Sequence, residues 1–429
     1  MKKTVATWSA RLVGYRIYTN AFALMVSAAG SGLLGLLYWY VAAHLASPKF
    51  LGRAAAEIAA VTLLSTLAQL SFGSVFQRFL PRAGAKSRNL VITGYVTSVG
   101  TAFVVGIAYV ALGFSHRFFA PSINWSVLFV ATIVFYTVFA LEDAVLISLR
   151  VSRWVAVENI LFGIAKLVIL LPLAVYAAGQ GIVISWTLPL VATIFVVNWY
   201  IFRRRLPEHV RTTQISQPLP TLKRMLSLSI PQFAGTILSI FSTSVVTLIV
   251  IAKLGAVANA HYYLAAQVAA APTLFIWSIS RLLIVEVSHE PSDQRSHLVQ
   301  SAVAMGAVLV VAMGVGITFA HPILSIFGSA YASQGTTLLR LLLLALPGTV
   351  VASTYAALAW IDGRVWFLMI REGGAILVYL AIVLLLINHD GINSVGYAAL
   401  VTSGVELVLF LPVTVRRIRA MKIVKPAGS

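Results

Sequence analysis

The sequence contains no cysteine and few charged residues. Asp, Glu, Lys and Arg together make up only 10% of its 429 residues. The absence of thiols excludes disulfides, iron–sulfur clusters and zinc sites held by thiolates. Because soluble domains carry about 25% charged residues, the low charge content argues against an ordinary soluble fold.

The sequence also lacks the short motifs of common enzyme classes. It contains no D-x-D, H-E-x-x-H, G-x-S-x-G or Walker A pattern. A membrane glycosyltransferase or polymerase needs carboxylates or histidines displayed outside, where we expect only Glu57 and Asp390 among the acids. We therefore expect a protein that is not an enzyme, with no cofactor and no metal ion.

Long apolar segments dominate the chain, which is 60% hydrophobic and has a mean hydropathy of +0.94. A helix of about 20 apolar residues crosses the ~30 Å hydrocarbon core of a bilayer. The sequence therefore predicts an all-α, polytopic membrane protein with about twelve transmembrane helices. We place them at 20–43, 55–78, 89–112, 125–149, 155–177, 181–202, 227–252, 259–283, 299–320, 336–359, 366–387 and 392–415.

The chain has a net charge of +19, and its basic residues are unevenly distributed between the two sides of the membrane. With the N-terminus inside, 25 of the 31 Lys and Arg residues fall on the inner loops, inner helix ends and tails. The positive-inside rule predicts this bias, so the charge indicates topology rather than binding of nucleic acid. We expect both termini on the cytoplasmic side.

The longest polar stretch, at 203–224, divides the chain into two similar halves. We expect an N-terminal six-helix lobe at 1–202, a cytoplasmic linker at 203–225 and a C-terminal six-helix lobe at 226–429. Arg150 and Arg364 close the fourth span of each half, and Glu158 and Glu372 follow at the same offset of 214 positions. Six spans per half give both copies one orientation, as in transporters built from parallel repeats.

Polar residues form stripes along the spans at 20–43, 55–78, 227–252 and 259–283. Such residues face protein or water rather than lipid, so we expect these four helices to line a central cavity between the two lobes. Close packing of small residues is the alternative explanation for each single stripe. The amides expected to bind substrate on these stripes are Gln69, Gln77, Gln232 and Gln267.

Three arginines, Arg16, Arg78 and Arg281, lie at the predicted inner ends of these cavity helices. Guanidinium groups bind phosphate through paired hydrogen bonds, so the three are candidates for holding an anionic substrate at an inner mouth. The alternative is that they only anchor the helices at the inner membrane surface. For His261, Tyr262 and Tyr263, at the outer end of their span, we expect an interfacial aromatic belt.

Lys166 lies about eleven residues into its span, or ~16 Å along the helix axis, near the membrane centre. A charge there costs about 2.5–3.5 kcal/mol, so it needs a partner or a hydrated path. Glu142, Asp143 and Glu406 are the candidate partners in a buried ion pair. A proton or cation relay that couples transport is the functional alternative.

Several local motifs lie at the ends of predicted spans. They are Leu45-Ala46-Ser47-Pro48 with Leu51-Gly52-Arg53, Gly73 through Pro81, Leu254-Gly255 with Tyr262 through Ala265, Asp362-Gly363-Arg364, and Gly391 through Gly396. With these motifs the sequence resembles the polysaccharide-export branch of the multidrug/oligosaccharidyl-lipid/polysaccharide exporter superfamily, the Wzx-type flippases. His261 departs from the pattern, because the family often has glycine there.

The resemblance implies two six-helix lobes around a V-shaped cavity with alternating access. It implies a multi-pass protein of the bacterial inner membrane that flips a polyprenyl-pyrophosphate-linked oligosaccharide to the outer leaflet. Its expected partners are this substrate and membrane lipids, with a polysaccharide polymerase or ligase left open. A cation-coupled exporter of drugs or small molecules and a non-transporting scaffold of polysaccharide assembly remain the alternatives.

Overall fold

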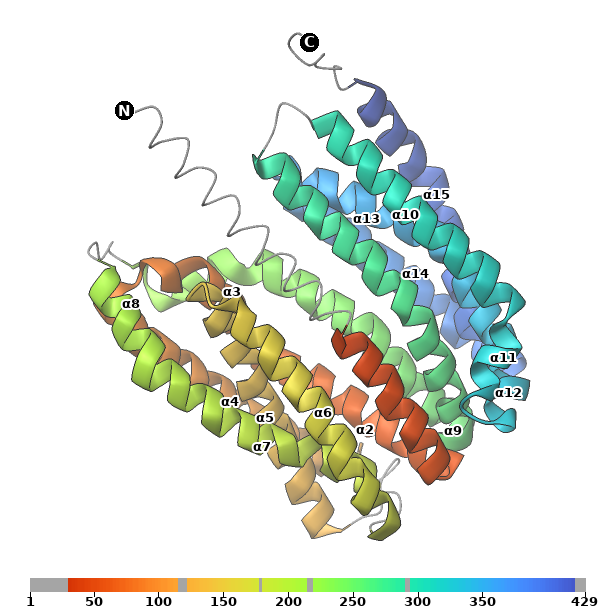
Figure 1. Cartoon of the computed structure of the whole chain (residues 1–429), viewed down its shortest axis with the longest axis horizontal. Helices are drawn as coiled ribbons and strands as arrows, with labels where there is room; N and C mark the ends of the chain where they lie inside the picture. Colours follow the sequence, from red (N-terminus) through yellow and green to blue (C-terminus); the bar gives the residue numbers. More distant parts are fainter. Residues whose placement is uncertain (1–29, 115–121, 177–179, 214–218, 290–293, 421–429) are drawn as a thin grey trace.

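The computed structural model describes residues 30–114, 122–176, 180–213, 219–289 and 294–420. Within these ranges every regular element is a helix (Figure 1). Ten helical segments there are long and apolar enough to cross a membrane, and one of them is 63 residues long and supplies two spans. Together with a helix over residues 30–45, this confirms an all-α, multi-pass membrane protein with about twelve transmembrane helices.

The N-terminal lobe begins, within the described residues, with the helix over residues 30–45. It continues with α2 (Pro48–Ala68), α3 (Phe72–Phe79), the 3-10 turns η1 (Leu80–Arg82) and η2 (Gly84–Lys86), α4 (Ser87–Ala111), α5 (Ile123–Ser148), α6 (Ser152–Tyr176) and α7 (Gly181–Tyr200). Helix α7 passes through a π-helical turn, η4 (Ile201–Arg205), into α8 (Leu206–Thr212). Helical structure therefore extends about ten residues beyond the expected lobe boundary at 202.

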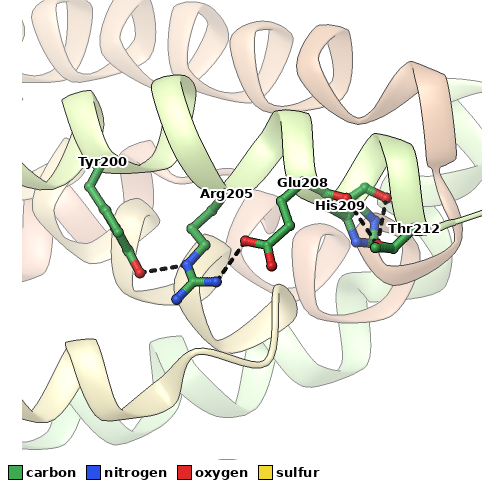
Figure 2. A network of polar contacts seen from close by, with 5 residues as sticks. All are labelled: Tyr200, Arg205, Glu208, His209 and Thr212. Carbon is green, nitrogen blue, oxygen red and sulfur yellow. Dashed lines mark hydrogen bonds and ion pairs between the residues drawn. The ribbon is translucent and has the colours of Figure 1, made fainter.

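Side-chain contacts explain why the helix continues into the polar stretch. The Arg205 guanidinium donates hydrogen bonds to the Tyr200 hydroxyl and to Glu208, the latter at 2.7 Å (Figure 2). One turn later, the His209 ring lies 3.1 Å from the Leu80 carbonyl oxygen. The contact of His209 with Leu80 holds α8 against the end of α3, and helical structure covers the first ten residues of the expected linker.

The C-terminal lobe starts with α9 (Leu222–His289), which turns back at Gly255, where φ is 87°. We call residues 222–254 the first arm and 256–289 the second arm. The remaining helices are α10 (Gln294–Thr318), α11 (Ala320–Ser325), α12 (Ser329–Leu344), α13 (Leu346–Ile361), α14 (Val365–Asp390) and α15 (Asn393–Ala420). In Figure 1, α9 runs between the α2–α8 group and the α10–α15 group.

The two lobes repeat the same turn between their fourth and fifth spans. Arg150 and Gly363 both adopt a left-handed conformation, with φ of 60° and 69°. The residue after each donates its N–H to the carbonyl five positions back, at 3.0 Å and 2.9 Å respectively. The equivalent bonds align 150 with 363, an offset of 213 instead of the expected 214. Glu158 therefore corresponds to Arg371, not to Glu372.

The lobes contact each other closely at one end of the bundle. We call this the distal contact. The Asn259 side-chain amide donates a buried hydrogen bond of 2.7 Å to the Gly52 carbonyl oxygen. A Cβ on Gly52 would stand 1.8 Å from the Ala256 carbonyl oxygen, so the two backbones touch. The Trp39 and Tyr263 rings pack edge-on beside them, with centroids 4.6 Å apart.

A second contact joins the lobes at the opposite end, which we call the basic end because Arg78, Arg82, Lys86 and Arg203–Arg205 lie there. Arg78 donates to the Leu228 carbonyl oxygen at 3.0 Å, and Gln232 donates to Gln77 at 2.8 Å. Both bonds are exposed. We call these two bonds the basic-end contact.

Candidate substrate cavity

A cavity of about 580 Å³ lies between the lobes. Most of its lining comes from the helix over residues 30–45, from α2 and from both arms of α9. Helices α6 and α7 add one residue each, Lys166 and Trp186. The four segments whose polar stripes suggested a cavity therefore supply most of its wall.

The lining is mainly apolar and aromatic, with hydroxyl groups set into it. The second arm presents a residue every fourth position, namely Tyr262, Ala266, Ala270, Leu274 and Ser278. This spacing brings residues onto one face of a helix. Hydroxyl groups from the first arm and from two other helices complete the polar part of the wall: Thr243, Ser244, Thr247, Ser31 and Thr62.

Lys166 is the single charged residue among the described residues of the lining. Its side chain is largely buried, with 8% relative exposure. The Lys166 Nζ lies 4.6 Å from the Trp186 ring centroid, 5.1 Å from that of Tyr38 and 5.3 Å from that of Phe162. We call these four residues the lysine cage. Ring faces attract a cation by roughly 0.5–2 kcal/mol each, which offsets part of the cost of burial.

The cage is held in place by its own hydrogen bonds. The Tyr38 hydroxyl donates to the Ile182 carbonyl oxygen at 2.9 Å and lies 2.8 Å from the Ser185 hydroxyl. Tyr38 is fully buried, so its ring cannot swing away without breaking these bonds. The ammonium group is therefore fixed at the cavity wall.

None of the expected carboxylate partners reaches Lys166. Among the described residues, no Asp or Glu forms an ion pair with it. Glu142 accepts a hydrogen bond from Asn198 at 2.6 Å, and Asp143 lies 3.4 Å from the Asn159 amide nitrogen. Glu406 lies in the other lobe, 3.9 Å from Arg371. The expected ion pair is thus replaced by the aromatic cage, because the carboxylates lie elsewhere.

The four predicted glutamines do not converge on one site. Gln267 lines the cavity, whereas Gln77 and Gln232 bond to each other in the basic-end contact. Gln69 caps the end of α2, and its carbonyl oxygen accepts a bond from the Ser98 hydroxyl at 3.3 Å. Only Gln267 is placed to touch a molecule in the cavity.

The predicted arginines lie apart from the lining. Arg78 belongs to the basic-end contact, and Arg281 is exposed at the second arm of α9. Arg16 falls outside the described residues. Neither described arginine borders the cavity, so Lys166 is the cation that does.

The aromatic wall is the feature that the sequence reasoning missed. Tyr262 and Tyr263 line the cavity instead of forming an interfacial belt, and Trp39 and Trp186 face it from other helices. A signal was present, because Tyr262 begins the four-residue spacing that continues to Ser278. The contribution of Trp186 had no such signal.

No protein-family model and no curated protein sequence matches the chain, whereas solved structures share its fold. The lipid II flippase MurJ, in an inward closed conformation, matches with a TM-score of 0.73 and 16% identity over 93% of this chain and 87% of that chain. The MATE multidrug transporter DinF-BH matches with a TM-score of 0.63 and 12% identity, covering 95% of this chain and 97% of its own. An inward-facing multidrug resistance MATE family transporter of the MOP superfamily gives 0.60 and 13% identity, over 92% and 94%. The chain therefore has the fold of these flippase and multidrug transporter structures.

Proposed function

We propose that the protein flips a polyprenyl-pyrophosphate-linked oligosaccharide, a precursor of a cell-surface polysaccharide. Transport runs from the inner to the outer leaflet of the bacterial inner membrane. In this orientation the basic end and both termini are cytoplasmic, in agreement with the positive-inside rule. The membrane lipids and the lipid-linked substrate are its proposed partners, and a polysaccharide polymerase or ligase would receive the product.

The observation that carries this proposal is the lysine cage at the cavity wall. A buried ammonium group without an ionic partner attracts an anion, because charged groups are costly in an apolar environment unless they are paired. Phosphate oxygens are strong acceptors for its three N–H donors. The cargo that suits this cavity therefore carries a negative charge, as a pyrophosphate does.

The rest of the wall suits the other parts of such a cargo. Hydroxyl groups and the Gln267 amide can exchange hydrogen bonds with sugar hydroxyls, and aromatic faces such as Trp39 provide flat apolar surface for sugar rings. A cavity of about 580 Å³ falls within the range of about 300–1,000 Å³ usual for ligand sites. The polyprenyl chain would stay in lipid, where it needs no polar partner.

Arg78 and Arg281 are proposed as first contacts at the cytoplasmic mouth. Arg78 donates one of its five N–H groups to the Leu228 carbonyl oxygen, so the other N–H groups can bind a phosphate. In this order, the head group would meet the arginines first and Lys166 second. Movement of the two lobes then exposes the cavity to the outer side, as in other transporters with repeated halves.

A cation-coupled multidrug exporter is the competing function, because MATE multidrug transporters share the fold. The mostly apolar wall could hold a drug. However, the described lining contains Lys166 and no carboxylate, so it repels a cationic drug and offers it no counter-charge. A scaffold without transport has no use for the cavity at all.

The test is depletion of the protein in its host, followed by extraction of lipid-linked sugars and a protection assay in sealed membranes. We expect a full-length lipid-linked glycan to accumulate on the inner face, and wild-type protein to remove it. Lys166→Met keeps an unbranched apolar side chain of nearly the same length but removes the charge, and we expect it to fail. Lys166→Arg should restore part of the activity, since it keeps the charge.

Lys253→Met is the matched control, because Lys253 is exposed on the same transporter and lies outside the cavity lining. It should complement as well as wild type. Full complementation by Lys166→Met would remove the lysine from the mechanism. If no lipid-linked glycan accumulates and drug sensitivity rises on depletion, the multidrug exporter replaces the flippase. Complementation by the Arg78→Ala, Arg281→Ala double variant would remove only the proposed cytoplasmic mouth.

A further inference from the structure

Three carboxyl groups gather inside the N-terminal lobe, away from the cavity wall. Glu142 and Asp143 come from α5 and Glu158 from α6, and we call them the N-lobe carboxyl cluster. Glu142 is fully buried and Glu158 is 3% exposed. The carboxyl groups of Glu142 and Glu158 lie beside each other, and Asp143 adjoins both.

The cluster has too few hydrogen-bond donors for its oxygens. Asn198 donates to one oxygen of Glu142, and Asn159 approaches one oxygen of Asp143. The second oxygen of each, and both carboxyl oxygens of Glu158, are buried without a donor among the described residues. The Asn198 side-chain oxygen and the Tyr95 hydroxyl are buried there without a partner too. Unpartnered buried polar atoms therefore extend beyond the carboxyl groups themselves.

No fixed cation balances these groups. The titratable side chains that face the cluster are Tyr95 from α4, Tyr136 from α5 and the three carboxyls themselves from α5 and α6. Helix α7 contributes only the amide of Asn198. No Lys, Arg or His in the described part of the chain forms an ion pair with any of them.

In the C-terminal lobe, the partly buried carboxyl groups have an arginine as their positively charged partner. Arg371 lies eight residues after its left-handed turn residue, as Glu158 does in the N-terminal lobe (371 − 363 and 158 − 150). The Arg371 guanidinium is 3.6 Å from Glu372 and 3.9 Å from Glu406, and it donates to the Ala352 carbonyl oxygen at 3.2 Å. At the position equivalent to Arg371, the N-terminal lobe has the carboxyl group of Glu158 instead of a guanidinium.

Three adjacent carboxylates cannot all stay ionised in such a place. Like charges in a desolvated site repel strongly, and at least one of a pair then holds a proton. Two carboxyl groups form a hydrogen bond to each other only when one is protonated. The described residues contain no group of His, Asp and Glu side chains arranged to hold a metal ion, which favours protons as the missing positive charge.

We infer that the N-lobe carboxyl cluster is a proton-binding site that loads and unloads protons during the transport cycle. Loading moves a proton from water onto a carboxylate oxygen of Glu142 or Glu158, and unloading returns it to water. The proton binding stands by itself, whereas its coupling to transport rests on the proposed function. The C-terminal lobe needs no such exchange, since Arg371 is its permanent cation.

Two short links join the cluster to the lysine cage. Tyr136 lies seven residues before Asp143 on α5, and its ring stacks on Trp186 with centroids 6.0 Å apart. Asn159 lies seven residues before Lys166 on α6. Residues seven apart share a helix face and are separated by about 10.5 Å. At that distance inside a low-dielectric lobe, protonation of the cluster changes how strongly Lys166 attracts an anion.

Infrared difference spectroscopy tests the proton site without any cargo. Full-length protein in lipid nanodiscs is titrated from acid to alkaline pH in H₂O and in D₂O. We expect a C=O stretching band of protonated carboxyl groups that shifts in D₂O. At neutral pH, where exposed carboxyl groups are ionised, its intensity should fall in Glu142→Gln and in Glu158→Gln and fall furthest in the double variant, in which Asp143 remains. The thermal unfolding of each variant is measured to check that it remains folded.

Glu372→Gln and Glu406→Gln are the matched controls, because these carboxyl groups lie beside Arg371 in the other lobe. They should leave the band unchanged. Absence of the band at neutral pH in wild type, or an undiminished band in the double variant, overturns the proton site. An equal loss in the C-lobe controls overturns the difference between the lobes.

The coupling has a separate test in proteoliposomes with a fluorescent polyprenyl-pyrophosphate-linked disaccharide. If one proton moves with each cargo, the ratio of flipped to unflipped probe changes about tenfold per pH unit of imposed gradient. The Glu142→Gln, Glu158→Gln variant should lose this dependence. Flipping that ignores the gradient in wild type overturns the coupling, and absence of flipping contradicts the proposed function while the infrared result still decides the proton site.

Discussion

The distal and basic-end contacts hold the same two lobes together by different means. The distal contact is dry: Leu51, Ala55, Ala260 and Leu264 around it are fully buried, and its one hydrogen bond is inaccessible to water. The basic-end contact consists of two exposed hydrogen bonds. Water can replace exposed bonds at little cost, whereas a buried bond and close packing are lost outright. The comparison indicates that the lobes separate more easily at the basic end.

Residue size explains the difference. At the distal contact, Gly52 lets the backbone of α2 touch the second arm of α9 at Ala256. Within a membrane, lipid chains are as apolar as side chains, so helices associate mainly through such close packing. At the basic end, the long side chains of Arg78 and Gln77 make the contact with α9 through exposed hydrogen bonds. The distal contact is therefore tightly packed, whereas the basic-end contact can open more easily; we call the latter the latch.

The largest effect is expected from Gly52→Ala. The added methyl group would stand 1.8 Å from the Ala256 carbonyl oxygen, so the helices must move apart and the Asn259 bond must stretch. Overpacking typically costs about 1–3 kcal/mol, and contact with a rigid backbone falls at or above the top of that range. We expect a clear fall in the thermal unfolding midpoint of the purified protein in detergent.

Gly100→Ala is the control for that change. An added Cβ at Gly100 meets nothing within 4 Å, so the substitution should be neutral or should stabilise α4 by about 0.5–1 kcal/mol. If Gly52→Ala and Gly100→Ala have the same midpoint, the close packing at the distal contact contributes nothing to stability.

An intermediate effect is expected from Asn259→Ala. The change leaves the buried Gly52 carbonyl oxygen without its donor, which costs about 1–3 kcal/mol. Gln300→Ala is the comparison, because the Gln300 amide makes an exposed bond of 3.2 Å to Ser296 and its loss should change stability by less than about 0.5 kcal/mol. Equal free energies of unfolding for the two variants would show that the distal hydrogen bond is not protected from water.

Much of the fold could be predicted because span length and charge placement report directly on the membrane. The continuation of helical structure beyond residue 202 was not predicted. Arg203–Arg205 and Pro207 are typical of a linker, but Pro207 lies in the first turn of α8, where a helix needs no N–H donor. The π-helical turn of η4 then keeps the chain helical through the arginines. Local composition alone does not distinguish these two cases.

The site was harder to predict because it is assembled from distant segments. Phe162 lies four residues before Lys166 on α6, a spacing that the sequence shows, but Tyr38 and Trp186 approach Lys166 from two other helices and no spacing relates them to it. The pairing of Glu158 with Arg371 differed by one residue from the expected repeat, and only the hydrogen bonds of the two turns show the true offset. Such facts depend on how helices are rotated against each other.

The smallest effect is expected from a double-mutant cycle on Gln77 and Gln232. Their bond is exposed, so each single change to Ala should cost less than about 1 kcal/mol, and the coupling energy should be about 0.5 kcal/mol. The same pair of positions also tests directly whether the lobes separate at the basic end. Because the chain has no cysteine, Gln77→Cys with Gln232→Cys introduces the only two thiols. We expect a disulfide between them to stop transport until it is reduced, since a latch that must open cannot work when it is covalently closed. Full transport by the disulfide-linked variant would mean that the lobes do not separate at the basic end. If the coupling energy of Gln77 and Gln232 also equals the loss of stability in Asn259→Ala, the distal contact is the one that opens.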